Sequence, residues 1–357
     1  MEKGKVPENV LKRSVFPQIR TKRKEILRGA GIGCDCATFS FPGEGEMLTC
    51  VQEAALASKG AAAAGDREEE AFMTIAGLIQ KCANNLAAGG GRPVAVLITL
   101  LLPEETAEPE IRMLMEEAGK KCGELSLQIA GGQTRITGAV RQPVATVTGF
   151  ARGWRTEGTL GRAEPGQDLV VSKWIGLQGT AWIAMHNRTK LLQRHPAWLV
   201  DAAEGFGACL SVIPEAEIAV KAGVCAMHDA SEGGIFGALW EMAEGAGVGL
   251  TVDMRKLPLR QETVEICEYC GVNPYELLSG GCLLMATRDG PGLTAALEAE
   301  HIPAVIVGRI TDNNDRILMN GEEIRYMDRP KRDSLFLLAE MFHTGENQEY
   351  QKERRIK

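Results

Sequence analysis

The sequence lacks any long uninterrupted apolar run, although 45% of its 357 residues are hydrophobic. A membrane-spanning helix needs about 20 apolar residues in succession. The strongest candidate, "PVAVLITLLLP" (93–103), is shorter and is bounded by prolines, so it predicts a buried strand instead. The charged N-terminus also lacks the apolar core of a secretory signal. We therefore expect no membrane partner and a cytoplasmic location.

An overall excess of positive charge is also missing. The net charge of −7 argues against nucleic acid as a general partner. Residues 1–28 differ from the rest, because they carry nine Lys and Arg against three Glu. This basic leader is equally consistent with binding of anions such as ATP phosphates and with a solvated arm.

The ten cysteines lack the spacing of a disulfide scaffold or a typical zinc site. Cys267 and Cys270 are three residues apart on a predicted helix, and Cys34 and Cys36 form the other close pair. A structural zinc ion usually takes four ligands from two such pairs. The spacing therefore favours reduced, buried thiols, with metal binding as the alternative.

The length of the chain and its composition predict two domains. A polar, glycine-rich segment around Pro165 marks the boundary, which gives an N-terminal domain at 1–150 and a C-terminal domain at 160–330. Residues 344–357 have almost no apolar side chains, so we expect a disordered tail there. Strand and helix patterns alternate in both domains, so the predicted fold class is α/β (α+β). The predicted helices include 65–90, 108–125, 179–187 and 195–206, and the predicted strands include 36–41, 93–102, 127–137, 143–153 and 168–172.

Several loops combine glycine with an acid or an amide, which predicts phosphate contacts. The stretch "GIGCDC" contains Gly33 and Asp35, and "MHDASEGG" leads through Gly233 and Gly234 into a predicted helix. Backbone N–H groups at a helix start bind anions. Each loop alone also fits an ordinary turn with a capping side chain.

The order of these motifs resembles the superfamily of aminoimidazole ribonucleotide synthetase, thiamine-monophosphate kinase, selenophosphate synthetase and the hydrogenase maturation factor HypE. The chain is most similar to HypE-like proteins. The resemblance implies a two-domain PurM-like fold in which the N-terminal domain closes a β-barrel across a homodimer. It also implies ATP in the cleft between the domains. The matching blocks are "GAGIGCDCA", "NNLAAGGGRPVAVLITLLLP", "AGGQTRI", "VVSKWIGLQGTAWIA" and "AMHDASEGGIFGALWEMAEGAGVGL".

The resemblance also implies Mg²⁺ held by acids from three N-terminal loops, and this chain departs from that pattern. The usual pair of acids reads Cys34-Asp35, and the usual Asn-Asp-Leu reads Asn84-Asn85-Leu86. The usual Gly-Gly-Asp-Thr or Gly-Gly-His-Thr is replaced by Gly131, Gly132, Gln133 and Thr134. Amides add no negative charge to a site for a hard cation. We therefore expect Asp35 as the remaining metal ligand in a weakened Mg²⁺ site. The resemblance also implies nucleotide contacts from Asp35, Asn84, Asn85 and the four residues 131–134.

In the second domain the resemblance places "MHDASEGG" at the nucleotide cleft. We predict His228 and Asp229 as a pair that orients substrate or moves a proton, with a turn cap and a surface histidine as the alternative. Lys173 is a predicted phosphate or carboxylate contact, and Trp174 is predicted core.

Three functions follow from the resemblance. The first is ATP-dependent activation of an amide or carbonyl oxygen by phosphoryl transfer, in a hydrogenase-maturation-like role with an unknown small molecule or a maturation partner protein. The second is a dimeric nucleotide-binding module without turnover, and the third is a kinase of the thiamine-monophosphate type. The resemblance implies that the full HypE reaction uses a C-terminal cysteine, whereas this chain reads "QKERRIK" there and has its last cysteine at Cys282. We therefore expect that the full reaction is not performed.

Overall fold

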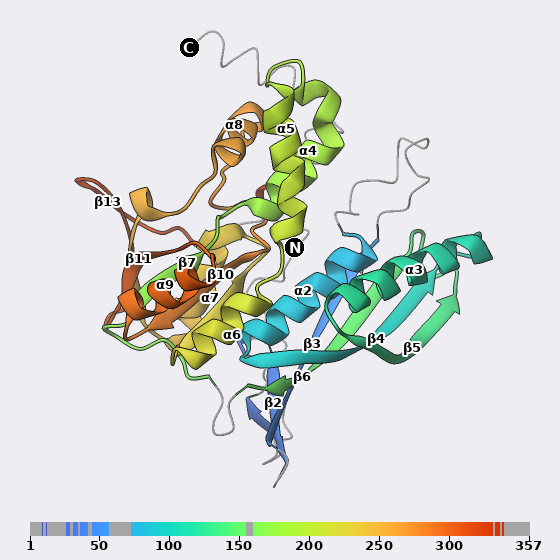
Figure 1. Ribbon diagram of the computed structural model, residues 1–357, viewed down its shortest axis with the longest axis horizontal. Coiled ribbons are helices and arrows are strands. Elements are labelled where there is room, and N and C mark those ends of the chain that lie inside the picture. Colours follow the sequence, from blue (N-terminus) through green and yellow to red (C-terminus); the bar gives the residue numbers. More distant parts are fainter. Residues whose placement is uncertain are drawn as a thin grey trace.

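A computed structural model describes residues 9, 12, 26–28, 31–34, 36–41, 45–56, 73–154, 160–330, 333–335 and 338. The described part of the chain folds into two halves, each built on its own β-sheet (Figure 1). The predicted tail at 344–357 lies outside the described residues, as does the segment 155–159 beside the predicted domain boundary.

Within its described residues, the N-terminal half contains six strands and two long helices. Apolar residues at helical spacing, among them Ile75, Ile79 and Leu86, form the buried face of helix α2, and Thr74 caps its start by accepting a hydrogen bond from Gly77 N at 3.1 Å. The elements are β1 (Ile26–Arg28), β2 (Ala37–Phe41), β3 (Gly45–Ala55), α2 (Ile75–Ala88), β4 (Gly91–Leu102), α3 (Glu108–Glu124), β5 (Gln128–Ile136) and β6 (Val144–Gly153).

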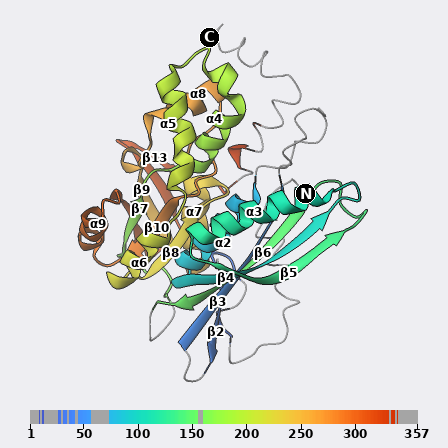
Figure 2. The ribbon, with the colours of Figure 1, turned by 45° about the vertical axis from the view of Figure 1, so that its right-hand side comes forward.

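The six strands form one sheet in the order β1-β2-β3-β6-β4-β5, in which only β4 and β5 pair in parallel. Helices α2 and α3 lie over the same face of this sheet (Figures 1 and 2). Beneath them, Val96, Ile98 and Leu100 alternate into the buried core. The prediction that "PVAVLITLLL" is a strand is thus confirmed. The outer face carries half-exposed side chains such as Leu97 and Phe150.

The C-terminal half contains a seven-stranded sheet in the order β13-β12-β9-β11-β7-β10-β8. All neighbouring strands pair antiparallel except β9 and β12. The elements are β7 (Asp168–Ser172), α4 (Leu177–Leu191), α5 (Ala197–Gly205), η4 (Phe206–Cys209), α6 (Ile213–Lys221), β8 (Ala226–Ala230), α7 (Gly234–Ala246), β9 (Gly249–Asp253), η5 (Met254–Lys256), α8 (Gln261–Cys270), β10 (Cys282–Thr287), α9 (Gly290–Ala299), β11 (Ala304–Thr311), β12 (Arg316–Asn320) and β13 (Glu323–Tyr326).

Helices cover both faces of this second sheet. Along β7, Leu169 and Val171 pack in a core that includes α7, whereas Val170 packs in a second core that includes α6 and α9. Helices α4, α5 and α8 form a separate group beside the sheet (Figure 1). The central strands are therefore buried on both sides, which explains their continuous apolar sequences.

Strand β8, at the edge of the second sheet, and helix α2 of the first half lie in contact. This junction brings the last turn of α2 next to the residues that follow η4. Among the described residues no single helix is long and apolar enough to cross a membrane. Taken together, the two segments Ala197–Cys209 and Ile213–Lys221 are long and apolar enough for a span, but they are bent relative to each other, and the match rests on length and composition alone.

Candidate functional site

The last turn of helix α2 carries Asn84 and Asn85 into the junction between the two halves. Both side chains are buried, with exposed fractions of 2% and 8%. The helix ends at Ala88 with Gly89 as its C-cap, and its last turn packs against the second half. Two neighbouring amides buried at this position must have partners, because an unpaired buried amide is costly.

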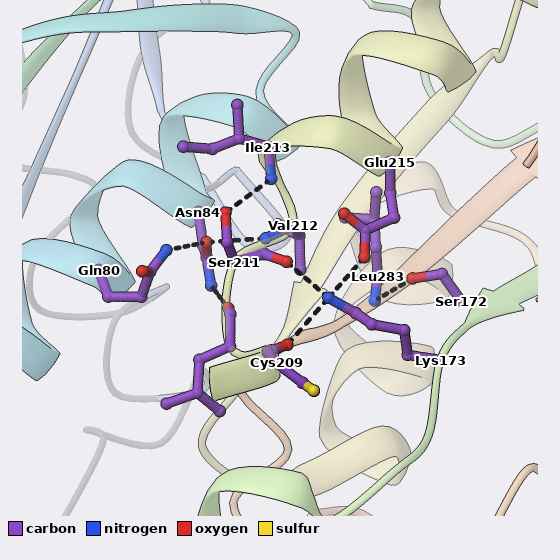
Figure 3. Close-up of polar contacts among 11 residues, drawn as sticks. Gln80, Asn84, Ser172, Lys173, Cys209, Ser211, Val212, Ile213, Glu215 and Leu283 are labelled. Atoms are coloured by element: carbon purple, nitrogen blue, oxygen red, sulfur yellow. Dashed lines mark hydrogen bonds and ion pairs between the residues drawn. The ribbon is translucent and has the colours of Figure 1, made fainter. Parts of the chain in front are cut away.

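Asn84 finds its partners on the backbone after η4. Its Nδ2 donates to Leu210 O at 2.7 Å, and its Oδ1 accepts from Val212 N at 3.1 Å (Figure 3). Gln80 Nε2 donates to the same oxygen at 2.9 Å. The predicted nucleotide contact of Asn84 is not tested by these bonds, but they already engage its amide in joining the two halves.

Asn85 lies beside Asp229 of strand β8. With the amide nitrogen facing Asp229, it lies 3.3 Å from Asp229 Oδ2 and 3.2 Å from Lys81 O, and the amide oxygen accepts from Gln52 Nε2 at 2.7 Å. Two predicted site residues, Asn85 from the first half and Asp229 from the second, therefore lie in contact at the junction. A small pocket opens there, lined among others by Lys81, Asp229 and Ser231.

His228 and Asp229 are neighbours within β8, not in the loop that follows it. Successive side chains in a strand point to opposite faces. His228 accordingly lines a different pocket from Asp229, and its Nε2 lies 3.2 Å from Glu241 Oε2 on α7. Its Nδ1 lies 2.9 Å from the backbone oxygen of Asp229, not from the carboxylate. The two side chains therefore do not form a His–Asp pair.

The predicted first loop forms a tight turn that packs on α7. Gly33 has φ +66°, and a Cβ there would lie 2.5 Å from Glu241 O, so only glycine fits. The turn lines the same pocket as His228, together with Arg28 and Arg162. Asp35, the predicted metal ligand, lies outside the described residues.

Gly131, Gly132, Gln133 and Thr134 lie in strand β5, which forms the exposed edge of the first sheet. A Cβ on Gly132 would lie 1.8 Å from Ile98 O, and its φ is +147°, so the strand needs glycine beside the irregular pairing with β4. All four residues are exposed. Their predicted nucleotide contact stays a prediction.

Lys173 follows strand β7 and is directed into the protein. Its ammonium donates to Cys209 O at 2.9 Å and to Ser211 O at 2.5 Å, and it lies 2.5 Å from Glu215 Oε1 (Figure 3). The side chains of Lys173 and Glu215 are only 11% and 2% exposed. A phosphate could reach this ammonium only by replacing one of these partners.

Gly233 and Gly234 begin helix α7 as predicted, but a carboxylate of the chain already lies at this helix start. Asp333 Oδ2 accepts from Gly233 N at 2.7 Å, and its Oδ1 accepts from Leu335 N at 2.9 Å and Leu278 N at 3.3 Å. Burial is the main cause that raises the pKa of Asp333 to about 6.

The sequence analysis missed Glu215 and Asp333. Glu215 stands in the first turn of α6 after a proline, a position where an acid is usually an exposed partner of the helix dipole. Asp333 precedes Ser334 and an apolar stretch, which is a weak helix-start signal. Neither pattern shows that the side chain is buried, because burial comes from elements distant in sequence.

The described residues do not provide the donor set of a tightly held Mg²⁺. They contain no group of three or more His, Cys, Asp or Glu side chains that could hold a metal. At the junction, one carboxylate, Asp229, faces the amide of Asn85. Mg²⁺ favours charged oxygens in octahedral arrangement, so we derive no step through this ion.

All ten cysteines are free thiols in the described structure, and seven of them are buried, whereas Cys34, Cys209 and Cys225 are partly exposed. Cys267 and Cys270 lie in the core between α4, α5 and α8, and burial raises the pKa of Cys267. Cys282 is fully buried in β10, where burial likewise raises its pKa. The predicted core residue Trp174 is partly buried and lies under the Arg260 guanidinium, 4.9 Å from the ring centre.

A helix-covered sheet in each half, joined at the junction through the Asn84 amide, defines a two-domain α/β protein. Comparison with known families gives the same result. The N-terminal domain of AIR synthase related protein matches residues 68–153, and the C-terminal domain of that family matches residues 164–319. The chain belongs to the AIR synthase related protein family.

Two relatives illustrate the range of this family. The carbamoyl dehydratase HypE of Rhodobacter capsulatus is 29% identical over 288 residues, which cover 76% of this chain and 82% of HypE. The thiamine-monophosphate kinase of Corynebacterium glutamicum is 32% identical over 202 residues, which cover 55% of this chain and 59% of the kinase.

Solved structures share the fold at low identity. A HypE in complex with ATP has a TM-score of 0.64 at 16% identity and covers 94% of this chain and 97% of its own. A chain from the structure of a HypE–HypF complex has a TM-score of 0.64 at 18% identity, and the match covers 83% of this chain and 93% of that chain. These likenesses confirm the predicted two-domain α/β fold.

Proposed function

We propose that the protein is an ATP-binding, HypE-like protein that activates an amide or carbonyl oxygen by phosphoryl transfer, in a hydrogenase-maturation-like role. The observation that carries the proposal is the approach of Asn85 to Asp229, one residue from each half, beside a pocket at the junction. HypE itself has been solved with ATP. The same fold and the same order of motifs support ATP binding here.

In the proposed reaction the substrate oxygen attacks the γ-phosphorus of ATP. The new O–P bond forms as the β–γ bridging P–O bond breaks, and ADP leaves with the electron pair. Such catalysis consists mostly of positioning and charge stabilisation. Lys81 and Asp229 line the junction pocket. In the proposal, the Lys81 ammonium neutralises phosphate charge and Asp229 orients a donor group of substrate or nucleotide.

The remaining proposed contacts come from the glycine-bearing loops. Gly33 and Asp35 belong to the first loop, and the β5 residues Gly131, Gly132, Gln133 and Thr134 belong to the third. Gly233 and Gly234 at the start of α7 are the proposed contacts from the second half, where a phosphate would replace the Asp333 carboxylate that accepts from Gly233 N. A homodimer is part of the proposal, because β5 is an exposed edge whose residues a second copy would cover. A partner protein is also proposed, and HypF is the protein found with HypE.

A nucleotide-binding module without turnover is the alternative. The amides Asn85 and Gln133, where the resemblance implies carboxylates, favour it. A third possibility is a kinase of the thiamine-monophosphate type. The similarity to the kinase of Corynebacterium glutamicum supports it, whereas the block "KWIGLQGTA" argues against it.

Calorimetry of ATP binding with and without Mg²⁺, followed by a phosphate-release assay, tests the proposal. We expect micromolar to millimolar ATP affinity with little Mg²⁺ dependence, and phosphate release once substrate is supplied. Binding without release over a range of amide and carbonyl substrates would favour the module. A protein that binds no ATP under either condition contradicts the proposal.

A second assay tests whether the full HypE reaction occurs. The protein is incubated with the carbamoyl-transfer partner of HypE, carbamoyl phosphate and ATP, and its intact mass is measured. We expect no adduct on Cys282, because this thiol is buried in the middle of a sheet. A stable carbamoyl adduct that loses water when ATP is added would show that another thiol serves as acceptor.

A further inference from the structure

We infer that Asn84 and Lys173 form a clamp on the backbone of residues 209–212 that fixes the two halves relative to each other and thereby sets the approach of Asn85 to Asp229. In this role both are positioning residues and not nucleotide contacts. The inference rests on the proposed function for its consequence in ATP binding, while the clamp itself is visible in the contacts of the chain alone.

One side of the clamp is the Asn84 amide. It donates to Leu210 O and accepts from Val212 N, so it pairs with the backbone as a neighbouring strand would (Figure 3). The two backbone partners also determine which end of the amide is oxygen, since a carbonyl must face N–H. Gln80, one helical turn earlier, holds the amide in place by donating to its oxygen.

The other side of the clamp is the Lys173 ammonium, which donates to the carbonyl oxygens of residues 209 and 211 in the same segment. An ammonium has three donors, and here they face Cys209 O, Ser211 O and Glu215 Oε1. Lys173 has φ +52°, an uncommon conformation for a lysine, and its own N–H donates to Pro303 O at 2.7 Å. The surrounding contacts therefore hold the residue in a strained conformation that directs its side chain at the segment.

A short path of contacts connects the clamp to the proposed site. Ser172, the neighbour of Lys173, accepts through Oγ from Leu283 N at 3.2 Å, and Leu283 pairs with Asp229 across β10 and β8. On the other side, Asn84 precedes Asn85 directly in α2. A shift of the segment relative to either half would change the distance between Asn85 and Asp229.

The test separates the clamp from general stability with paired charge-removing variants and a matched control. Lys173→Met alone leaves the buried Glu215 carboxylate without its cation and is expected to be strongly destabilised. The double variant Lys173→Met/Glu215→Met removes both charges, so it recovers much of the lost thermal stability, yet it cannot hold the two carbonyls. Asn84→Ala removes the opposite side. Lys221→Ala is the matched control, because Lys221 forms an exposed pair with Glu217 on the same helix as Glu215.

Amide hydrogen exchange of the free protein and calorimetric ATP affinity are measured for each variant. We expect faster exchange in both 209–213 and α2 for the double variant and for Asn84→Ala, and an ATP dissociation constant raised at least about tenfold. When the double variant is combined with Asn84→Ala, the ATP dissociation constant should rise by less than the product of the two separate fold-changes, because the substitutions act on one segment. The control should match the parent in both measurements.

Two results overturn the clamp. One is a double variant with the thermal stability and the ATP affinity of the parent. The other is faster exchange confined to 209–213, with α2 unchanged, because the segment would then not connect the halves. If the parent binds no ATP, the proposed function fails, while the exchange measurements still decide whether the clamp exists.

Discussion

Asn85 is the residue at which a metal site would be most easily rebuilt. Replacing Asn85 with Asp places a second carboxylate about 3 Å from Asp229, where two like charges repel. Without Mg²⁺ we expect Asn85→Asp to lower the melting temperature. With Mg²⁺ we expect the loss to be reversed and ATP binding to become Mg²⁺-dependent, because the cation neutralises the pair.

The matched comparison is Gln133→Asp, alone and together with Asn85→Asp. Gln133 is exposed on β5, so its single substitution should change stability little. Differential scanning calorimetry and ATP titrations, each with and without Mg²⁺, provide the readout. If the double variant binds Mg-ATP no better than the parent, the assignment of these two positions to a metal site is wrong.

Gly33 shows how one residue can fix a loop on a helix. Gly33→Ala meets both a left-handed φ and the carbonyl of Glu241, so we expect the free energy of unfolding to fall by more than about 2 kcal/mol. Gly166→Ala is the control, because its φ of +86° is also left-handed but no heavy atom lies within 4 Å of the added Cβ. Gly166→Ala should lower the free energy of unfolding by about 1 kcal/mol, which is the backbone strain alone. Equal losses in urea titrations would show that the contact with α7 does not matter.

Among the elements, the start of helix α7 makes the stability of the fold depend on whether Asp333 is protonated. Its pKa is raised from 3.8 to about 6, mainly by burial, and this shift corresponds to about 3 kcal/mol. The folded protein therefore takes up a proton between pH 6 and 4 that the unfolded chain does not. The stability that comes from this protonation is fully present below pH 4 and is lost as the pH rises through 6.

Asp333→Asn tests this dependence, since it removes the titrating group. The difference in free energy of unfolding between parent and variant should change by up to about 3 kcal/mol between pH 4 and 7, with the parent gaining relative to the variant as the pH falls. Urea titrations across this range measure it. A difference that does not vary with pH would contradict the assignment of the shift to Asp333.

At the scale of the whole molecule, the outer face of the first sheet predicts a homodimer. Val51 is 56% exposed, and the half-exposed Leu97 and Phe150 lie on the same face, opposite α2 and α3. Static light scattering should give twice the monomer mass at micromolar concentration. Leu97→Lys should shift the mass toward that of the monomer, whereas Met185→Lys, at a 55% exposed position on α4, should not. A monomeric parent protein would contradict the prediction.

Most of the helices and strands could be predicted from local sequence patterns. The apolar alternation of β4, the helical spacing of α2 and the glycines around α7 are local patterns, and local sterics and hydrogen bonding translate them directly into strands, helices and turns. The order of the motifs further identified the superfamily. Which of the chemistry-bearing residues meet was only partly visible, because it depends on contacts between residues far apart in the chain.

The partners of those residues became visible only in the folded chain. His228 and Asp229 are adjacent in sequence, yet the alternation of a strand separates them into different pockets. Asn84 and Lys173 looked like independent ligand contacts, yet they hold the same backbone segment from opposite sides. The start of α7 looked open to a phosphate, yet Asp333, about 100 residues later, lies there. Each outcome comes from the same physical requirement, that a buried polar group must find a partner, and the chain supplies that partner from a distance that no local pattern records.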